Sequence, residues 1–141
     1  MEKLMERLRS CQRALATLDE AVNMPFSVVV RDASIQRFEY SFESLWKLLK
    51  AHLEQCEGIR CNSPKRCFRE ALQVGLLSVD ETETCLVMTD DRNLTSHAYL
   101  EAVAEAIYRK LPSYLTVMRT LVANIQAHIA RPVDRVGGSG E

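Results

Sequence analysis

Apolar residues recur every three or four positions along three long segments of the chain, and this spacing gathers them on one face of a helix. In the first segment these residues are Leu4, Leu8, Cys11, Leu15, Leu18 and Val22. In the second they are Ile35, Phe38, Phe42, Leu45, Trp46, Leu49 and Leu53. In the last they are Val103, Ile107, Leu111, Tyr114, Leu115, Met118, Leu121, Val122 and Ile125. The pattern predicts three long amphipathic helices.

Local signals predict where these helices begin and end. Pro25 ends the first helix, and Gly58 suits the left-handed turn that follows a helix. The last helix is expected over residues 99–130, with a kink or a break at Pro112, because proline removes one backbone donor. The apolar run "FSVVV", residues 26–30, is interpreted as a loop or a first helical turn, because no second strand pattern is present to pair with it.

Two shorter helices are expected between the long ones. Ser63 is a suitable N-cap for the first, with Pro64 at its first position and Gly75 as its stop signal. The second is expected to begin at Asp80, with Glu83 three residues later in the pattern of a capping box.

These elements predict an all-α fold, an antiparallel helical bundle of the four-helix up-and-down type with three long and two short helices. A chain of 141 residues suits one domain. The bundle is expected over residues 1–130, with Phe38, Phe42 and Trp46 in its core and the short helices closing one end. Residues 131–141 show no periodicity and are expected to form a flexible tail.

Composition excludes several classes of protein. The formal net charge is −1, from 18 basic and 19 acidic residues, which argues against a protein that coats nucleic acid through bulk charge. No apolar run is long enough to span a membrane, and no export signal opens the chain, so a cytoplasmic protein is expected.

The cysteines and histidines predict no metal site and no cofactor. Five cysteines, an odd number without regular spacing, are interpreted as reduced thiols. The separations of Cys56, Cys61 and Cys67 match no zinc knuckle. His52 and His128 are interpreted as structural or solvated residues.

The stretch "DDRNLTSHAY", residues 90–99, is unusually polar for this chain. As a plain junction it would place Thr95 or Ser96 as the cap of the last helix. His97 and Tyr99 would then lie in the first helical turn, where free backbone N–H groups and the helix dipole attract an anion. Arg92 would offer its guanidinium to a phosphate.

Arg92, Asn93, His97 and Tyr99 give the pattern Arg-Asn-x3-His-x-Tyr, which resembles the Arg-x4-His motif of the HEPN superfamily. Residues 37–50, "RFEYSFESLWKLLK", resemble the signature of the branch named nucleotidyltransferase substrate-binding protein. The resemblance continues through residues 63–77, "SPKRCFREALQVGLL". Three ordered blocks on a predicted helical bundle point to this family far more strongly than a lone Arg-x4-His pair does.

The resemblance implies a partner, an assembly and an activity. Family members associate with a minimal nucleotidyltransferase, and many HEPN domains are metal-independent ribonucleases that act as toxins. The motifs of two protomers face one another across a homodimer cleft. The partner of related toxins attaches a nucleotide to the motif tyrosine, and Tyr99 is the matching position. The family name suggests the alternative, a non-catalytic subunit that binds a nucleotide substrate for the partner.

Residue chemistry assigns roles within such a site. Cleavage of RNA without a metal needs a group that accepts the 2′-hydroxyl proton and a cation that stabilises the phosphorane. His97 suits the first role and Arg92 the second. Asn93 would orient His97 or hold a phosphate oxygen. Asp91 would pair with Arg92 and aim it, or remain solvated, and Ser96 would cap the helix.

A weaker suggestion concerns the second helix. Tyr40 and Glu43 lie off its apolar stripe, where they face either the motif or a partner.

Overall fold

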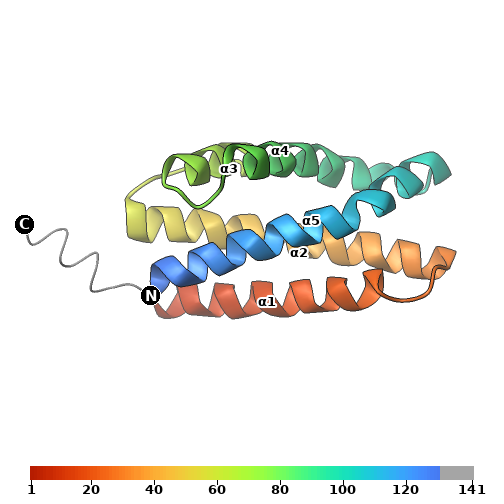
Figure 1. The fold of residues 1–141 in the computed structure, drawn as a ribbon, viewed down its shortest axis with the longest axis horizontal. Helices are drawn as coiled ribbons and strands as arrows, with labels where there is room; N and C mark the ends of the chain where they lie inside the picture. Colours follow the sequence, from red (N-terminus) through yellow and green to blue (C-terminus); the bar gives the residue numbers. More distant parts are fainter. Residues whose placement is uncertain (131–141) are drawn as a thin grey trace, which may run out of the picture.

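The computed structural model describes residues 1–130, and the predicted tail, residues 131–141, lies outside the described residues. The α-helices are α1 (Glu2–Val22), α2 (Val28–Glu57), α3 (Pro64–Gln73), α4 (Val79–Leu94) and α5 (Glu101–Ile129), with a short 3-10 helix, η1 (Thr95–His97), before α5 (Figure 1). Residues 1–130 contain no strand. The predicted all-α bundle is confirmed.

The direction of each helix follows from the residues that meet. Gln12 of α1 contacts Gln126 of α5, and Arg119 of α5 pairs with Asp19, so α1 and α5 are antiparallel. Phe38 of α2 stacks on Tyr114 of α5. Because Arg31 near the start of α2 also meets Glu101 at the start of α5, these two helices run in the same direction. In an up-and-down bundle formed by α1, α2, α4 and α5, the second and fourth helices run in the same direction (Figure 1).

The two shorter helices occupy a different place from the one expected. They lie along one side of the α2–α5 pair, not across the end of the bundle (Figure 1). Asn124 of α5 donates to the carbonyl of Leu76 before α4, and Lys110 of α5 pairs with Asp91 near the end of α4. Contacts at both ends show that α4 runs antiparallel along α5 and completes the four-helix arrangement.

Serine residues start three of the helices. Ser27 caps α2, so "FSVVV" contributes the first turn of that helix, one of the two predicted alternatives. Ser63 caps α3 as predicted. The predicted cap at Asp80 is wrong: Ser78 accepts from the backbone N–H of Glu81 at 3.1 Å, and the Glu81 carboxylate accepts from the Ser78 N–H at 2.8 Å. This reciprocal pair satisfies two backbone donors and fixes the start of α4 two residues earlier.

Aromatic side chains fill the centre of the bundle. The Phe38 ring lies 6.2 Å from that of Phe42 and 5.7 Å from that of Tyr114, and Phe42 contacts Phe68 of α3 edge-on at 6.0 Å. Phe38 and Phe42 are fully buried, as predicted. Trp46 is only partly buried, because its indole N–H donates to the Glu43 carboxylate at the surface of α2.

Pro112 does not break α5, which continues from Glu101 to Ile129. The flanking residues Leu111, Tyr114 and Leu115 are buried against the rest of the bundle and hold both halves of the helix in place. Tertiary packing therefore offsets the loss of one backbone hydrogen bond at the proline.

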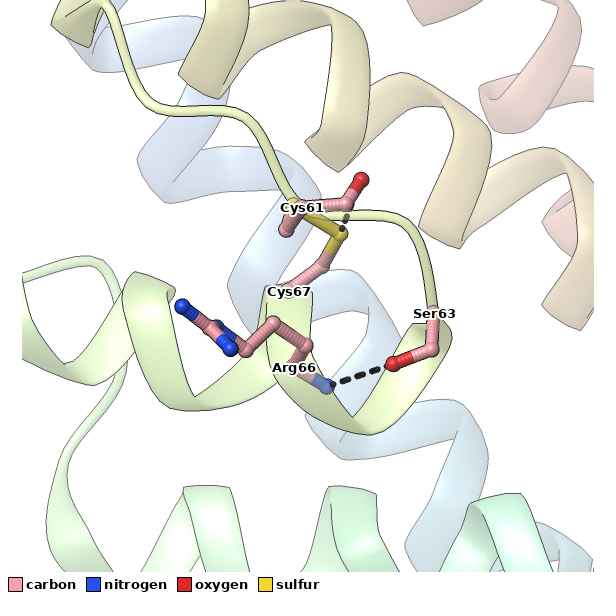
Figure 2. Close-up of a disulfide and its surroundings, with 4 residues drawn as sticks. All are labelled: Cys61, Ser63, Arg66 and Cys67. Carbon is pink, nitrogen blue, oxygen red and sulfur yellow. Dashed lines mark hydrogen bonds between the residues drawn. A yellow bond between two sulfur atoms is a disulfide. The ribbon is translucent and has the colours of Figure 1, made fainter.

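Cys61 and Cys67 form a disulfide, which joins the α2–α3 loop to the first turn of α3 (Figure 2). The expectation that all the cysteines are reduced is wrong for this pair, because the loop before α3 brings their Cα atoms to 5.4 Å from each other. Cys11 and Cys85 are buried thiols, and burial raises the pKa of each to about 12. None of the helices in residues 1–130 combines the length and apolar character that crossing a membrane requires.

Candidate functional site

Residues 90–99 end one helix and do not begin the next. Residues 90–94 belong to α4, and α5 starts at Glu101 after Leu100, which makes no side-chain cap. The prediction that Thr95 or Ser96 caps the last helix is therefore wrong. Thr95 instead donates its hydroxyl to the carbonyl of Arg92 at 2.7 Å, which satisfies an acceptor at the C-terminal end of α4. His97 therefore lies before α5 and not in its positive first turn.

Asp91 is the most buried carboxylate of this stretch. Its side chain accepts hydrogen bonds from the Tyr114 hydroxyl and from the Lys110 ammonium group, the latter at 3.1 Å. The suggestion that Asp91 pairs with Arg92 is wrong, because Asp91 lies on the face of α4 that packs on α5. Burial raises the pKa of Tyr114, and the hydrogen bond to Asp91 raises it further. Asp91 is thus a structural residue that joins α4 to α5.

Arg92 lies on the neighbouring face of α4 and contacts α2. Its guanidinium Nη2 is 3.2 Å from Oε1 of Glu43, and Nη1 is 4.0 Å from a carboxylate oxygen of Glu39. Nη1 also donates to Thr95 at 3.3 Å. The side chain is 26% exposed, so the cation is positioned by α2 and still reaches the surface.

The weak suggestion that Glu43 faces the motif is confirmed by this contact. Tyr40 instead hydrogen-bonds to Thr17 of α1. The contact of Glu39 with Arg92 was not predicted. Glu39 lies one turn before Glu43 on α2, but the sequence does not show that Arg92 packs against this part of the helix.

The other predicted site residues are exposed. Asn93, Ser96, His97 and Tyr99 all lie at the surface, and Ser96 donates to the carbonyl of Asn93 at 3.3 Å. The His97 and Tyr99 rings are neighbours, with centroids 6.2 Å apart, and Tyr99 is 79% exposed. The structure therefore brings His97 and Tyr99 together at the surface, whereas Arg92 is held by carboxylates of α2 and by Thr95.

An open groove of about 250 Å³ runs between Tyr99 and the N-terminal half of α2. Its lining residues are Asp32, Ile35, Gln36, Glu39, Ala98 and Tyr99. The two carboxylates make this groove acidic. A group that enters it meets Tyr99 on one side and the carboxylates of α2 on the other.

Residues 92–99 carry a cation, an imidazole and a phenol. Arg92 is held in place by carboxylates, whereas the imidazole of His97 is accessible for proton transfer. Within residues 1–130, the group of three histidine or acidic side chains with converging ligand atoms lies elsewhere, at His52, Glu57 and His128. A guanidinium can stabilise negative charge, and an accessible imidazole can transfer a proton.

Solved structures share this fold at high coverage. A crystal structure of a Thermus thermophilus protein superposes with a TM-score of 0.79 and 46% sequence identity, over 82% of this chain and 98% of that one. A Haemophilus influenzae structure superposes with a TM-score of 0.72 and 26% identity, over 84% and 98% of the two chains. That structure is described as revealing the fold of a substrate binding domain of a nucleotidyltransferase.

Sequence comparison identifies a further relative and a matching family. A Haemophilus influenzae protein named probable ribonuclease HepT is 33% identical over 86 residues, which cover 58% of each chain. The chain thus spans less than two thirds of the length of that relative. The family described as nucleotidyltransferase substrate binding protein like matches residues 6–127, nearly the whole described bundle. The chain belongs to this family of nucleotidyltransferase substrate binding protein-like domains.

Proposed function

We propose that this protein is a HEPN-type partner of a minimal nucleotidyltransferase and cleaves cytoplasmic RNA without a metal ion, as the toxin of a toxin–antitoxin pair. The observation that carries the proposal is the exposed His97 five residues after an Arg92 that two α2 carboxylates hold at the surface. The ribonuclease name of the Haemophilus influenzae relative supports the same activity.

In this proposal His97 accepts the proton of the RNA 2′-hydroxyl, whose oxygen attacks the adjacent phosphorus. Arg92 stabilises the additional negative charge of the phosphorane. The bond from phosphorus to the 5′-oxygen then breaks, and the 5′-oxygen takes up the proton that His97 has accepted. The products carry a 2′,3′-cyclic phosphate and a free 5′-hydroxyl. We assign Asn93, which is exposed and follows Arg92 in the sequence, to hold a phosphate oxygen.

Exposed apolar residues around the motif support assembly with another protein. Leu94 and Leu100 lie three residues before and after His97 in the sequence and are 44% and 49% exposed, and Tyr99 directly before Leu100 is 79% exposed. Exposed apolar side chains that form a patch mark interaction sites, and this segment is our candidate for one. We place the homodimer contact here, with two motifs facing one another, and the accessible Tyr99 hydroxyl as the position at which the partner attaches a nucleotide.

A second function is favoured by the electrostatics of the site. Glu39 and Glu43 neutralise Arg92, and Asp32 adds further negative charge to the groove beside Tyr99. RNA binding draws on positive surface, and the chain has a formal net charge of −1. These features suit a non-catalytic subunit that binds a nucleotide substrate through its base or sugar and presents it to the nucleotidyltransferase.

Cleavage of RNA in EDTA separates the two functions. The wild type should release fragments with 2′,3′-cyclic phosphate ends, and Arg92→Ala and His97→Ala should abolish the release. Ser96→Ala is a matched control on the same exposed turn and should cleave normally. A folded, unmodified wild type that leaves RNA intact, yet raises the activity of a nucleotidyltransferase partner, would establish the binding subunit instead.

A further inference from the structure

Two histidines and a glutamate converge at the end of the bundle where α2 and α5 finish. His52 and Glu57 belong to the last two turns of α2, and His128 is the penultimate residue of α5. One ligand atom from each of the three side chains lies within 4.8 Å of the other two. The two imidazole rings meet edge-on, with centroids 5.8 Å apart.

The fold explains why residues so far apart in sequence meet. Because α2 and α5 run in the same direction, their C-terminal ends lie side by side (Figure 1). Gly58 adopts a left-handed conformation with φ of 66° and ends α2 directly after Glu57. The three side chains form a path from core to surface: His52 is fully buried, His128 is partly buried and Glu57 is exposed. Glu57 is therefore the ligand of the three that lies nearest to solvent.

We propose that His52, Glu57 and His128 form a binding site for a divalent transition-metal ion, with Zn²⁺ as the best match. Two imidazoles and one carboxylate are a donor set that zinc sites use, with water as a fourth ligand. Mg²⁺ and Ca²⁺ prefer sites made of oxygen ligands alone. The negative dipole ends of two helices meet here and add favourable electrostatics for a cation.

The distances require only a small adjustment. Ligand atoms about 2.0–2.2 Å from a tetrahedral zinc lie roughly 3.3–3.6 Å from one another. Donor atoms already within 4.8 Å of each other reach that spacing through side-chain rotations on the order of 1 Å. The carboxylate at the open edge is the most mobile of the three groups because it is exposed.

The site is separate from residues 92–99. Arg92 contacts α2 at Glu43, and His52 lies nine residues later on the same helix. At about 1.5 Å per residue this places the metal site roughly 14 Å further along the bundle. The ion would join the ends of α2 and α5 and stabilise the folded chain, because it binds only where the three ligands have come together. The proposal does not depend on the proposed ribonuclease activity.

Isothermal titration of the full-length protein with Zn²⁺, in a buffer that does not chelate metals, tests the site. We expect one equivalent to bind, and His128→Gln and Glu57→Gln to weaken binding by at least about tenfold, since even indirect supports of a metal ligand contribute that much. Two matched controls should bind normally: His97→Gln removes the remaining histidine, and Glu54→Gln removes an exposed carboxylate one turn before the site.

Two further measurements distinguish this site from zinc binding at a nearby thiol and from a variant that fails to fold. Cys56→Ser tests the free thiol one turn after His52, and it should leave Zn²⁺ affinity unchanged. Zn²⁺ should raise the melting temperature of the wild type and leave that of a folded His128→Gln variant unchanged. The proposal is overturned if the wild type binds no Zn²⁺, if Cys56→Ser abolishes binding, or if His128→Gln binds and is stabilised as strongly as the wild type.

Discussion

Two sets of residues within one short stretch of sequence have opposite environments. Asp91, Arg92 and Thr95, the anchored set, are tied to α5, α2 and the end of α4. The exposed set, formed by Ser96, His97 and Tyr99, lies at the surface. This polar stretch therefore combines two environments: the anchored set joins α4 to the neighbouring helices, and the exposed set has its side chains open to solvent.

The largest effect is expected from Asp91→Ala. This change leaves the Tyr114 hydroxyl and the Lys110 ammonium group without their shared carboxylate between α4 and α5. Loss of the carboxylate leaves the buried Tyr114 hydroxyl unpaired, which costs about 2 kcal/mol, whereas the Lys110 side chain is 46% exposed and remains solvated. Urea denaturation should show this loss of unfolding free energy. Asp90→Ala is the matched control: its ion pair with Lys65 is exposed, so the change should cost less than about 1 kcal/mol.

A smaller effect is expected from Tyr114→Phe, which removes the hydroxyl and keeps the ring stacked on Phe38. The unfolding free energy should fall by about 1 kcal/mol, the usual net contribution of one hydrogen bond. Because the hydroxyl acts through Asp91, the double variant with Asp91→Ala should be less destabilised than the sum of the single changes. Strict additivity would show that the two groups act independently.

Glu43→Gln tests whether the ion pair that holds Arg92 in the anchored set is needed for RNA cleavage by the proposed site. The amide oxygen still accepts from the Trp46 indole, whereas the ion pair with Arg92 is lost. The unfolding free energy should change by less than about 1 kcal/mol, because the pair is partly exposed. RNA cleavage should fall about tenfold, because a displaced cation stabilises the phosphorane poorly. Glu39→Gln, at the longer 4.0 Å contact, should have the weaker effect. Equal cleavage by Glu43→Gln and the wild type would contradict a positioning role.

The smallest effect is expected at the boundary of the exposed set, where Arg31 binds Glu101 at the start of α5. The hydrogen bond from Arg31 lowers the pKa of Glu101 below its usual range. A lowered folded-state pKa contributes stability above the ordinary carboxyl pKa, and this contribution disappears as the pH falls through the lowered value. Glu101→Gln should therefore be less stable than the wild type at neutral pH and equal to it in acid, as measured by thermal unfolding across pH.

Much of the fold could be predicted from the sequence, because the core residues repeat with helical spacing. Helix starts were harder. Ser78 and Asp80 each precede a glutamate by three residues, so two overlapping capping patterns fit the same stretch. The disulfide between Cys61 and Cys67 depends on how one loop folds back, which spacing does not reveal.

The polar residues of the stretch 90–99 stand out in the sequence, but their hydrogen bonds and ion pairs could not be predicted from it. The Thr95 hydroxyl can accept from a backbone N–H at the start of one helix or donate to a backbone carbonyl at the end of another. The sequence does not show which of these two hydrogen bonds forms. The partners of Arg92 and Asp91 come from other helices, so only the packing of α4 against α2 and α5 defines them.

The most direct test of the central claim is RNA cleavage by His97→Ala, measured together with its unfolding free energy. An exposed residue outside the anchored set should change stability by no more than about 0.5 kcal/mol. We predict that cleavage is lost while the unfolding free energy stays within that range. Cleavage at the wild-type rate by the folded variant would contradict the assignment of His97 as the chemical member of the site.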